Sequence, residues 1–199
     1  MLYVVLRELA RFVFLALCGA RVRRATLPAG GVVIASNHQS YLDPVLLGAG
    51  ISRHLSFMAR DTLFTNPLFG PLIRAVHAFP VRRDGVGKEG LKEAVRRLKA
   101  GEAVVIFPEG TRSLDGEVGE IREGAGLLAR LASVPVVPAA VEGTFNVWPK
   151  GRAYPLPAPI RVAYGKAIPS ERFREDAAGA REELGDAIKM LHKGLRETS

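Results

Sequence analysis

The chain has 199 residues, 48% hydrophobic and 24% charged, which is enough length and apolar content to bury a core and argues against a disordered segment. A net charge of +8 and a pI of about 10.1 fit an anionic partner, which could be nucleic acid, an anionic bilayer or a phosphorylated substrate. Aromatic residues make up only 7% and no basic stripe alternates with them, so a nucleic-acid-binding module is disfavoured. The single cysteine, Cys18, excludes an intramolecular disulfide and a cysteine-rich metal site.

The first 24 residues predict an amphipathic helix. Leucine, valine and phenylalanine side chains fill one side of the helical wheel, and the other side carries Arg7, Arg11, Cys18 and Arg21. The uninterrupted apolar run at 12–20 is too short to span a hydrocarbon core, which needs about 20 apolar residues. The arginines inside and after this run do not fit a signal peptide.

We therefore expect residues 1–24 to form a membrane-associating helix in the headgroup region of an anionic bilayer, followed by one folded domain at 25–199. One alternative is a helix that packs on the protein's own core. Another is that the membrane contact lies on the apolar stretch at 63–73.

The rest of the chain alternates between short apolar runs and amphipathic stretches. Strands are expected at residues 32–35, 79–81, 103–107 and 134–141, with an edge strand at 160–164. Helices are expected at residues 44–47, 88–100, 124–132 and 176–196. Residues 57–78 are mixed and apolar, broken by prolines and glycines, and indicate no clear element. This order predicts an α/β layered domain with a central, mostly parallel or mixed sheet flanked by helices.

Two of the expected helices carry clear apolar faces. Gly101 suits the position just beyond the first of them, whose apolar face consists of Leu91, Val95 and Leu98. On the last helix four residues share one face: Leu184, Ile188, Leu191 and Leu195.

A polar segment with the sequence NHQSYLDP, residues 37–44, directly follows the strand expected at 32–35. His38 and Asp43 would point about 140° apart on one helix, so they meet only if His38 lies in the loop and Asp43 in the first helical turn. Ser40 would then be the N-cap and Asp43 the N3 position of a capping-box-like start. In a second interpretation, Asp43 holds the imidazole of His38 in one tautomer while the other ring nitrogen accepts a proton.

A second loop, with the sequence FPEGTRS at 107–113, also leaves an expected strand. By itself it indicates an ordinary Pro/Gly turn, with Glu109 and Arg112 as a solvated ion pair.

Together the two loops resemble the glycerolipid acyltransferase family typified by 1-acyl-sn-glycerol-3-phosphate acyltransferase. That family carries an Asn-His-x-x-x-x-Asp motif and a Phe-Pro-Glu-Gly-Thr-Arg-Ser motif. Blocks similar to AFPVRRD at 78–84 and VPVVP at 134–138 follow in the family's order. Three features depart from the family: Arg60 stands where lysine is common, His77 stands near an expected glycine, and the N-terminal membrane segment is short.

The resemblance implies an acyltransferase domain at 25–199 that moves a fatty acyl group from acyl-CoA or acyl-carrier protein to a lysophospholipid hydroxyl. The expected acceptor is 1-acyl-sn-glycerol 3-phosphate and the product phosphatidic acid. His38 would be the general base and Asp43 its orienting partner. Cys18 is not the expected nucleophile, because the hydroxyl attacks the thioester directly. Substrate binding is implied for Glu109, Gly110, Thr111, Arg112, Arg82 and Arg60.

Arg112 is the expected grip on the acceptor phosphate. Glu109 would orient either Arg112 or a glycerol hydroxyl, and Arg82 either binds substrate or ends a strand in solvent. No cofactor, metal or nucleic acid is expected. The bilayer would be a partner, with the protein peripheral or monotopic on the cytoplasmic face of the cell membrane.

Other interpretations stay open. The acceptor could be glycerol 3-phosphate or another lyso-lipid, and the same pair of residues could serve a lipid ester or thioester hydrolase. The remaining histidines are expected to be structural or at the surface: His54, His77 and His192.

Overall fold

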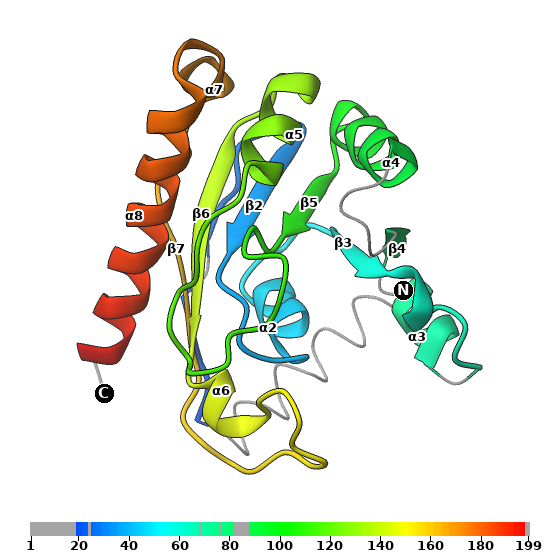
Figure 1. Cartoon of the computed structure of the whole chain (residues 1–199), viewed down its shortest axis with the longest axis vertical. Helices are drawn as coiled ribbons and strands as arrows, with labels where there is room; N and C mark the ends of the chain where they lie inside the picture. The colour runs from blue at the N-terminus through cyan, green and yellow to red at the C-terminus, as the bar shows by residue number, and fades with distance from the viewer. Residues whose placement is uncertain (1–18, 24, 68, 76, 82–87, 198–199) are drawn as a thin grey trace.

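The computed structural model describes residues 19–23, 25–67, 69–75, 77–81 and 88–197 (Figure 1). Most of the helix expected at 1–24 therefore lies outside the described residues. The helix prediction does not hold at its end, where Arg21–Val22 form strand β1. Arg82 also lies outside the described residues.

Within these described residues, one mixed sheet of seven strands forms the centre of the molecule, in the order β1-β7-β6-β2-β5-β3-β4 (Figure 1). After β1 the strands are β2 (Val32–Ser36), β3 (Leu55–Arg60), β4 (Ala78–Val81), β5 (Ala103–Ile106), β6 (Val136–Glu142) and β7 (Arg161–Tyr164). All neighbouring pairs are parallel except β6 and β7, which are antiparallel. The expected α/β architecture with a mostly parallel sheet is confirmed.

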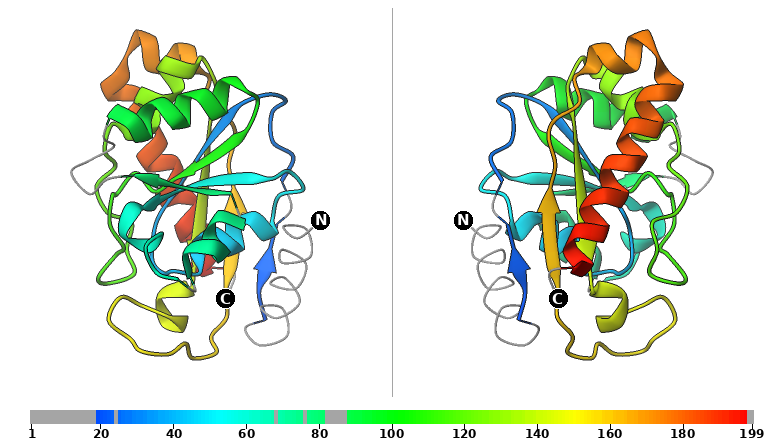
Figure 2. Two further views of the ribbon diagram at one scale, coloured as in Figure 1. Left: turned by 90° about the vertical axis from the view of Figure 1, so that its right-hand side faces the viewer. Right: turned by 90° about the vertical axis from the view of Figure 1, so that its left-hand side faces the viewer.

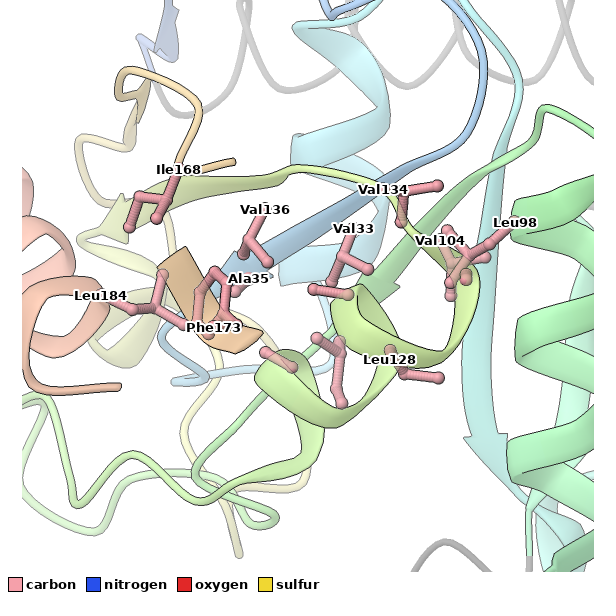
Figure 3. Close-up of a cluster of buried hydrophobic side chains, with 14 of the residues drawn as sticks. Val33, Ala35, Leu98, Val104, Leu128, Val134, Val136, Ile168, Phe173 and Leu184 are labelled. Carbon is pink, nitrogen blue, oxygen red and sulfur yellow. The ribbon is translucent and has the colours of Figure 1, made fainter. Parts of the chain in front are cut away.

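Helices cover both faces of this sheet (Figure 2). They are α2 (Asp43–Ala49), α3 (Phe69–Ala75), α4 (Lys88–Lys99), α5 (Gly124–Ala132), α6 (Thr144–Val147), α7 (Ser170–Glu175) and α8 (Ala177–Glu197), with a 3-10 turn η1 at Asp61–Leu63. Val33 and Ala35 of β2 pack with side chains of α4, α5, α7 and α8 (Figure 3). The alternate residues Val32 and Ile34 pack on the other face, against α2. A strand buried on both faces is apolar along most of its length, as β2 is at 32–35, which is why β2 was recognisable in the sequence.

The end of α4 follows the sequence pattern closely. Gly101 has φ of +87°, its N–H donates to the carbonyl of Leu98, and the N–H of Glu102 donates to that of Arg97, both at 3.0 Å. This is a Schellman C-cap, in which a glycine in the left-handed region closes the helix.

Two expectations were wrong in detail. The strand expected at the edge, β7, is an inner strand, because β1 pairs with it through Arg21 and Arg161. The stretch at 57–78 contains most of β3 and all of α3, whose first turn includes Gly70 and Pro71. Glycine lowers helix propensity, and proline is tolerated in a first turn. Pairing with β5 and β4 places β3 in the sheet, and local propensity does not show such pairing.

The parallel strands β2, β5 and β6 end at one edge of the sheet, and the loops after them meet there. Ligands of open α/β sheets bind outside this carboxyl edge. Among the described residues, no helix is both long and apolar enough to cross a membrane.

Candidate active site

His38 and Asp43 meet at this edge. His38 lies in the loop after β2, and Asp43 is the first residue of α2. His38 Nδ1 is 2.8 Å from Asp43 Oδ2, the side chain of His38 is 19% exposed, and that of Asp43 is fully buried. With the Nδ1 proton held by the carboxylate, Nε2 is the ring nitrogen left to accept a proton.

The carboxylate of Asp43 is surrounded by donors. The backbone N–H groups of Gln39 and Ser40 each donate to Oδ2 at 2.7 Å, and the hydroxyl of Thr144 donates to Oδ1 at 2.7 Å. Together with His38 these are four hydrogen bonds. They satisfy a charged group that would otherwise be costly to bury.

The expected capping arrangement is wrong in one respect. The N-cap of α2 is Leu42, not Ser40, and no side chain caps this end. The hydroxyl of Ser40 instead donates to the carbonyl of Trp148 at 2.8 Å. Asp43 still accepts the backbone N–H of the residue three positions before it, Ser40, as the expected pattern requires, although Asp43 is the first residue of α2 and not its third. Asp43 therefore both closes the loop locally and holds the imidazole.

Asn37, the first residue of the NHQSYLD segment, has a structural role that its position in the motif did not show. Its Nδ2 donates to the carbonyl of Val141 at 2.9 Å, and the Val141 N–H donates to its Oδ1 at 2.8 Å. The side chain thus binds β6 just beyond the end of β2. This pair of bonds sets where the loop that carries His38 begins.

The FPEGTRS loop packs directly against His38. The ring of Phe107 stacks on the imidazole, with 3.9 Å between centroids and 17° between planes. The backbone N–H of His38 donates to Glu109 Oε1 at 3.1 Å, and the N–H of Ser113 donates to the His38 carbonyl at 2.7 Å. Two loops 71 residues apart are therefore joined through the backbone of one histidine.

Glu109 is not half of a solvated ion pair. It is buried, and among the described residues it makes no ion pair with Arg112. Burial raises its pKa to about 7, although hydrogen bonds from the backbone of His38 and Gly119 act in the opposite direction. The hydrogen bond from the His38 backbone joins Glu109 to the loop that carries the histidine.

Arg112 lies over the ring of Tyr41, with its guanidinium carbon 3.6 Å from the ring centroid. Its Nη1 is buried and finds no hydrogen-bond partner within the described part of the chain. Gly110 and Thr111, just before it, are exposed, and Gly110 turns the loop with φ of +74°. A buried guanidinium N–H without a partner is unfavourable unless a ligand accepts from it.

The remaining expected site residues are farther away or outside the described residues. Arg60 is the last residue of β3, two strands from β2 in the sheet order, and pairs in register with Val81. His77, where the resemblance leads one to expect glycine nearby, has φ of +63°. That conformation is in the left-handed region that favours glycine.

A second layer of polar groups behind the pair was missed from the sequence. Gln39 is buried, and its Nε2 donates to the carbonyl of Gly116 at 2.6 Å and lies 3.0 Å from His192 Nε2. His192 is 3% exposed and lies 2.5 Å from Glu142 Oε2. The spacing from Ile188 placed His192 on the apolar face of α8, which was the one available signal.

The comparisons with known proteins agree with this geometry. A family model described as Acyltransferase matches residues 20–142. The 1-acyl-sn-glycerol-3-phosphate acyltransferase of Bacillus subtilis (strain 168) is 35% identical over 178 residues, which are 86% of this chain and 87% of that protein. The chloroplastic 1-acyl-sn-glycerol-3-phosphate acyltransferase LPAT1 of Arabidopsis thaliana is also 35% identical, over 79% of this chain and 45% of the plant protein.

The fold is likewise shared with a solved structure. The crystal structure of the 1-acyl-sn-glycerophosphate (LPA) acyltransferase, PlsC, from Thermotoga maritima superimposes with a TM-score of 0.81 and 25% identity. The match covers 98% of this chain and 79% of that one. The chain therefore belongs to the acyltransferase family.

Proposed function

We propose that this chain transfers a fatty acyl group from a thioester donor to the free hydroxyl of 1-acyl-sn-glycerol 3-phosphate and so forms phosphatidic acid. Two observations together carry the proposal. His38 Nδ1 lies 2.8 Å from Asp43 Oδ2, and the loop that packs on His38 contains Arg112, whose buried Nη1 has no hydrogen-bond partner among the described residues. The pair supplies a base for an alcohol, and the guanidinium supplies a site for a phosphate. Relatives named for this activity, one of them 35% identical over most of both chains, support the acceptor.

In this mechanism His38 Nε2 takes the proton of the acceptor hydroxyl while its oxygen attacks the thioester carbonyl carbon. The new C–O bond gives a tetrahedral intermediate, whose collapse breaks the C–S bond. The imidazolium then returns the proton to the leaving thiolate. Asp43 keeps Nδ1 protonated and stabilises the imidazolium between these two steps. The reaction needs no acyl-enzyme and therefore no cysteine nucleophile.

Arg112 is proposed to hold the acceptor phosphate. Its contact with the ring of Tyr41 restricts the position of the guanidinium, and a planar fork binds phosphate oxygens in pairs. The exposed turn at Gly110 and Thr111 lies next to it in the chain and is proposed to contact the same acceptor. Arg60 and Arg82 remain proposals for donor or phosphate binding, because Arg60 ends β3 at the same edge of the sheet and Arg82 follows the parallel strand β4.

Two roles are left open for Glu109 by the sequence, the orientation of Arg112 or of a glycerol hydroxyl, and among the described residues Glu109 makes no ion pair with Arg112. Its Oε1 accepts from the backbone of His38, so we propose that it positions the histidine loop. A protonated Glu109 could also bind a glycerol hydroxyl through its other oxygen.

An acceptor panel tests the function. Labelled acyl-CoA and labelled acyl-carrier protein are each offered with 1-acyl-sn-glycerol 3-phosphate, glycerol 3-phosphate and other lyso-lipids, and the lipid products are identified by mass. We expect phosphatidic acid, formed only when the first acceptor is present. Free fatty acid released at the same rate without any acceptor would instead identify a hydrolase.

We also propose that the protein works at a membrane surface, peripheral or monotopic on the cytoplasmic face. The associating segment is narrower than the expected 1–24, because Ala20 is buried and Arg21–Val22 form strand β1 of the sheet. We therefore propose residues 1–18 as the associating segment and the rest of the chain as the acyltransferase domain. The acyl acceptor and the product both carry long hydrocarbon chains and reside in a bilayer. A protein at the interface meets them without extracting them into water.

A further inference from the structure

We propose that the loop between α6 and β7, together with the rim of the site, is a second surface that docks on an anionic bilayer, separate from the N-terminal segment. Five exposed side chains form this apolar rim: Tyr41, Val45, Leu114, Tyr154 and Leu156. The choice of a bilayer as the partner rests on the proposed function.

The location of the exposed apolar side chains is the first argument. Among the described residues, seven large hydrophobic side chains are exposed, and five of them form the apolar rim. All five lie in the segments that follow β2, β5 and β6 at the carboxyl edge of the sheet, where His38 and Asp43 lie. The other two exposed large hydrophobic side chains of the described part of the chain lie elsewhere, Leu131 on α5 and Met190 on α8. Soluble surfaces scatter such residues singly, whereas a cluster around a site indicates a binding surface.

The α6–β7 loop is attached to the histidine loop, so its position relative to the site is defined. The hydroxyl of Ser40 donates to the carbonyl of Trp148 at 2.8 Å, and the rings of Tyr41 and Trp148 meet edge to face with 6.1 Å between centroids. The N–H of Leu156 donates to the carbonyl of Val147 at 2.9 Å, which brings the loop back to α6. Figure 1 shows the loop extending beyond α6 at the end of the molecule to which β6 leads.

The shape of the loop favours a preformed docking element. It contains four prolines, Pro149, Pro155, Pro157 and Pro159, whose fixed φ angles reduce the conformational freedom that binding would remove. Trp148 Nε1 donates to the carbonyl of Arg152 at 3.0 Å, and Arg152 Nη1 donates to that of Asn146 at 2.7 Å. These bonds brace the base of the loop while Tyr154, 66% exposed, projects from it.

Charge selects an anionic lipid surface. The α6–β7 loop at 148–160 contains no aspartate or glutamate and carries two basic residues, Lys150 and Arg152, and Arg161 follows it at the start of β7. Tyrosine and tryptophan rings are favoured at the boundary between headgroups and acyl chains, because one end of the ring system is apolar and the other polar. A loop that carries exposed apolar side chains and cations beside a site for a lipid acceptor therefore fits the headgroup region of a bilayer.

The test uses the full chain and two matched double variants. One is Tyr154→Ser with Leu156→Ser, and the other is Leu131→Ser with Met190→Ser, which removes two exposed hydrophobic side chains far from the site. Binding is measured by co-sedimentation with phosphatidylcholine vesicles, with and without phosphatidylglycerol. We expect the first variant to bind about tenfold more weakly than the wild type and the second to bind normally.

Turnover separates membrane docking from acceptor binding. With acceptor embedded in vesicles, the Tyr154→Ser/Leu156→Ser variant should lose activity in parallel with binding. With a short-chain acceptor kept monomeric in solution, it should match the wild type. Two charge-reversal variants complete the set. Lys150→Glu should weaken binding only to vesicles that contain phosphatidylglycerol. Lys189→Glu, on the exposed side of α8, should leave binding to these vesicles unchanged.

Three results would overturn the proposal. Equal vesicle binding by both double variants would leave membrane contact to another segment. If the Tyr154→Ser/Leu156→Ser variant loses as much turnover with monomeric acceptor as with vesicle-embedded acceptor, the loop is part of the acceptor site. Binding of the rim to another protein instead of to vesicles would identify a protein interface. If no acceptor is turned over by any form while the binding pattern holds, the docking surface stands and the proposed function fails.

Discussion

His192 Nε2 lies 3.0 Å from the side-chain nitrogen of Gln39, although the two residues are 153 positions apart. Gln39 Oε1 in turn lies 3.2 Å from the hydroxyl of Thr144, which donates to Asp43 at 2.7 Å. A continuous set of polar contacts thus leads from the C-terminal helix α8 to the carboxylate behind His38. The far end of this set is Glu142, which also contacts Arg196.

Replacing His192 should affect both stability and turnover. Burial alone would raise the pKa of Glu142, but the hydrogen bond and charge of His192, with those of Arg196, lower the pKa below its usual range. His192→Leu leaves this carboxylate with one partner fewer, and we expect a loss of about 1–3 kcal/mol in the free energy of unfolding. We also expect a several-fold lower kcat with little change in either KM, because the change acts on Asp43 through Gln39.

Two controls separate positioning from general weakening of α8. His192→Gln places an amide where Nε2 lies and should restore most of kcat. Leu195→Ala removes buried apolar contact from the same helix and should lower stability without a comparable change in kcat. If Leu195→Ala slows turnover as much as His192→Leu does, the network has no specific role in positioning.

Removal of His38 should abolish acyl transfer. His38→Ala deletes the proposed general base, and such losses typically lower the rate by about 10²–10⁴-fold. Asp43→Asn should also lower kcat, because the amide no longer selects the tautomer with a proton on Nδ1. Thermal unfolding of the purified variants checks the fold. Near-normal turnover by folded His38→Ala would contradict the mechanism.

The sequence predicted the two loops of the site because each leaves an apolar strand, and parallel strands bring their carboxyl ends to one edge. It did not predict the layer formed by Gln39, Thr144 and His192. Those contacts join residues more than 100 positions apart and depend on how α8 docks on β6. Periodicity shows which face of a helix is buried but not which polar groups it will meet.

Long-range contacts that local patterns do not show also explain the errors in the predicted fold. The helix α4 was predicted well because its apolar face and its glycine C-cap are local features. The strand β3 has mixed polarity and is a strand because β5 and β4 pair with it on its two sides. Glu109 is a comparable case in the site, since only its burial against His38 distinguishes it from a solvated turn residue.

Glu109 should make stability depend on pH in a particular direction. Its pKa of about 7 lies above the ordinary value of 4.5, so the folded state binds a proton more tightly than the unfolded state. The stabilisation from that proton is complete below pH 4.5 and is lost as the pH rises through 7, by up to roughly 3 kcal/mol.

Glu109→Gln removes this titration. The variant should therefore gain stability relative to the wild type between pH 5 and pH 8, as measured by urea unfolding at a series of pH values. A constant offset is expected, because the amide cannot accept from both backbone N–H groups, but the slope is the diagnostic quantity. If the difference in the free energy of unfolding between Glu109→Gln and the wild type does not change with pH, Glu109 titrates alike in the folded and unfolded states.

Arg112→Lys should raise the acceptor KM much more than the donor KM. The lysine keeps the charge but replaces a planar fork with a point charge, and it loses the stacking on Tyr41. Steady-state kinetics with each substrate varied in turn measures both constants. Equal effects on the two substrates would assign Arg112 to transition-state binding or to the architecture of the loop.

The N-terminal segment should carry the largest share of membrane affinity. The structure decides where the cut must be made: Ala20 is buried and Arg21–Val22 pair with β7, so a truncation through residue 24 would also damage the sheet. Removing residues 1–18 avoids this. The sequence places two arginines, Arg7 and Arg11, in the removed part, beside an apolar helical face. Each cation near an anionic surface is worth about 1 kcal/mol, in addition to the buried apolar area.

We therefore expect the full chain to pellet with anionic vesicles and the chain lacking 1–18 to remain mostly in the supernatant. Salt should weaken binding of the full chain, because the screening length falls to about 10 Å at 0.1 M. The apolar rim of the site should leave the truncated chain a weak residual affinity that disappears when Tyr154→Ser and Leu156→Ser are added. Equal pelleting of the full and truncated chains would show that residues 1–18 do not associate with the membrane and would move the contact to the rim or to 63–73.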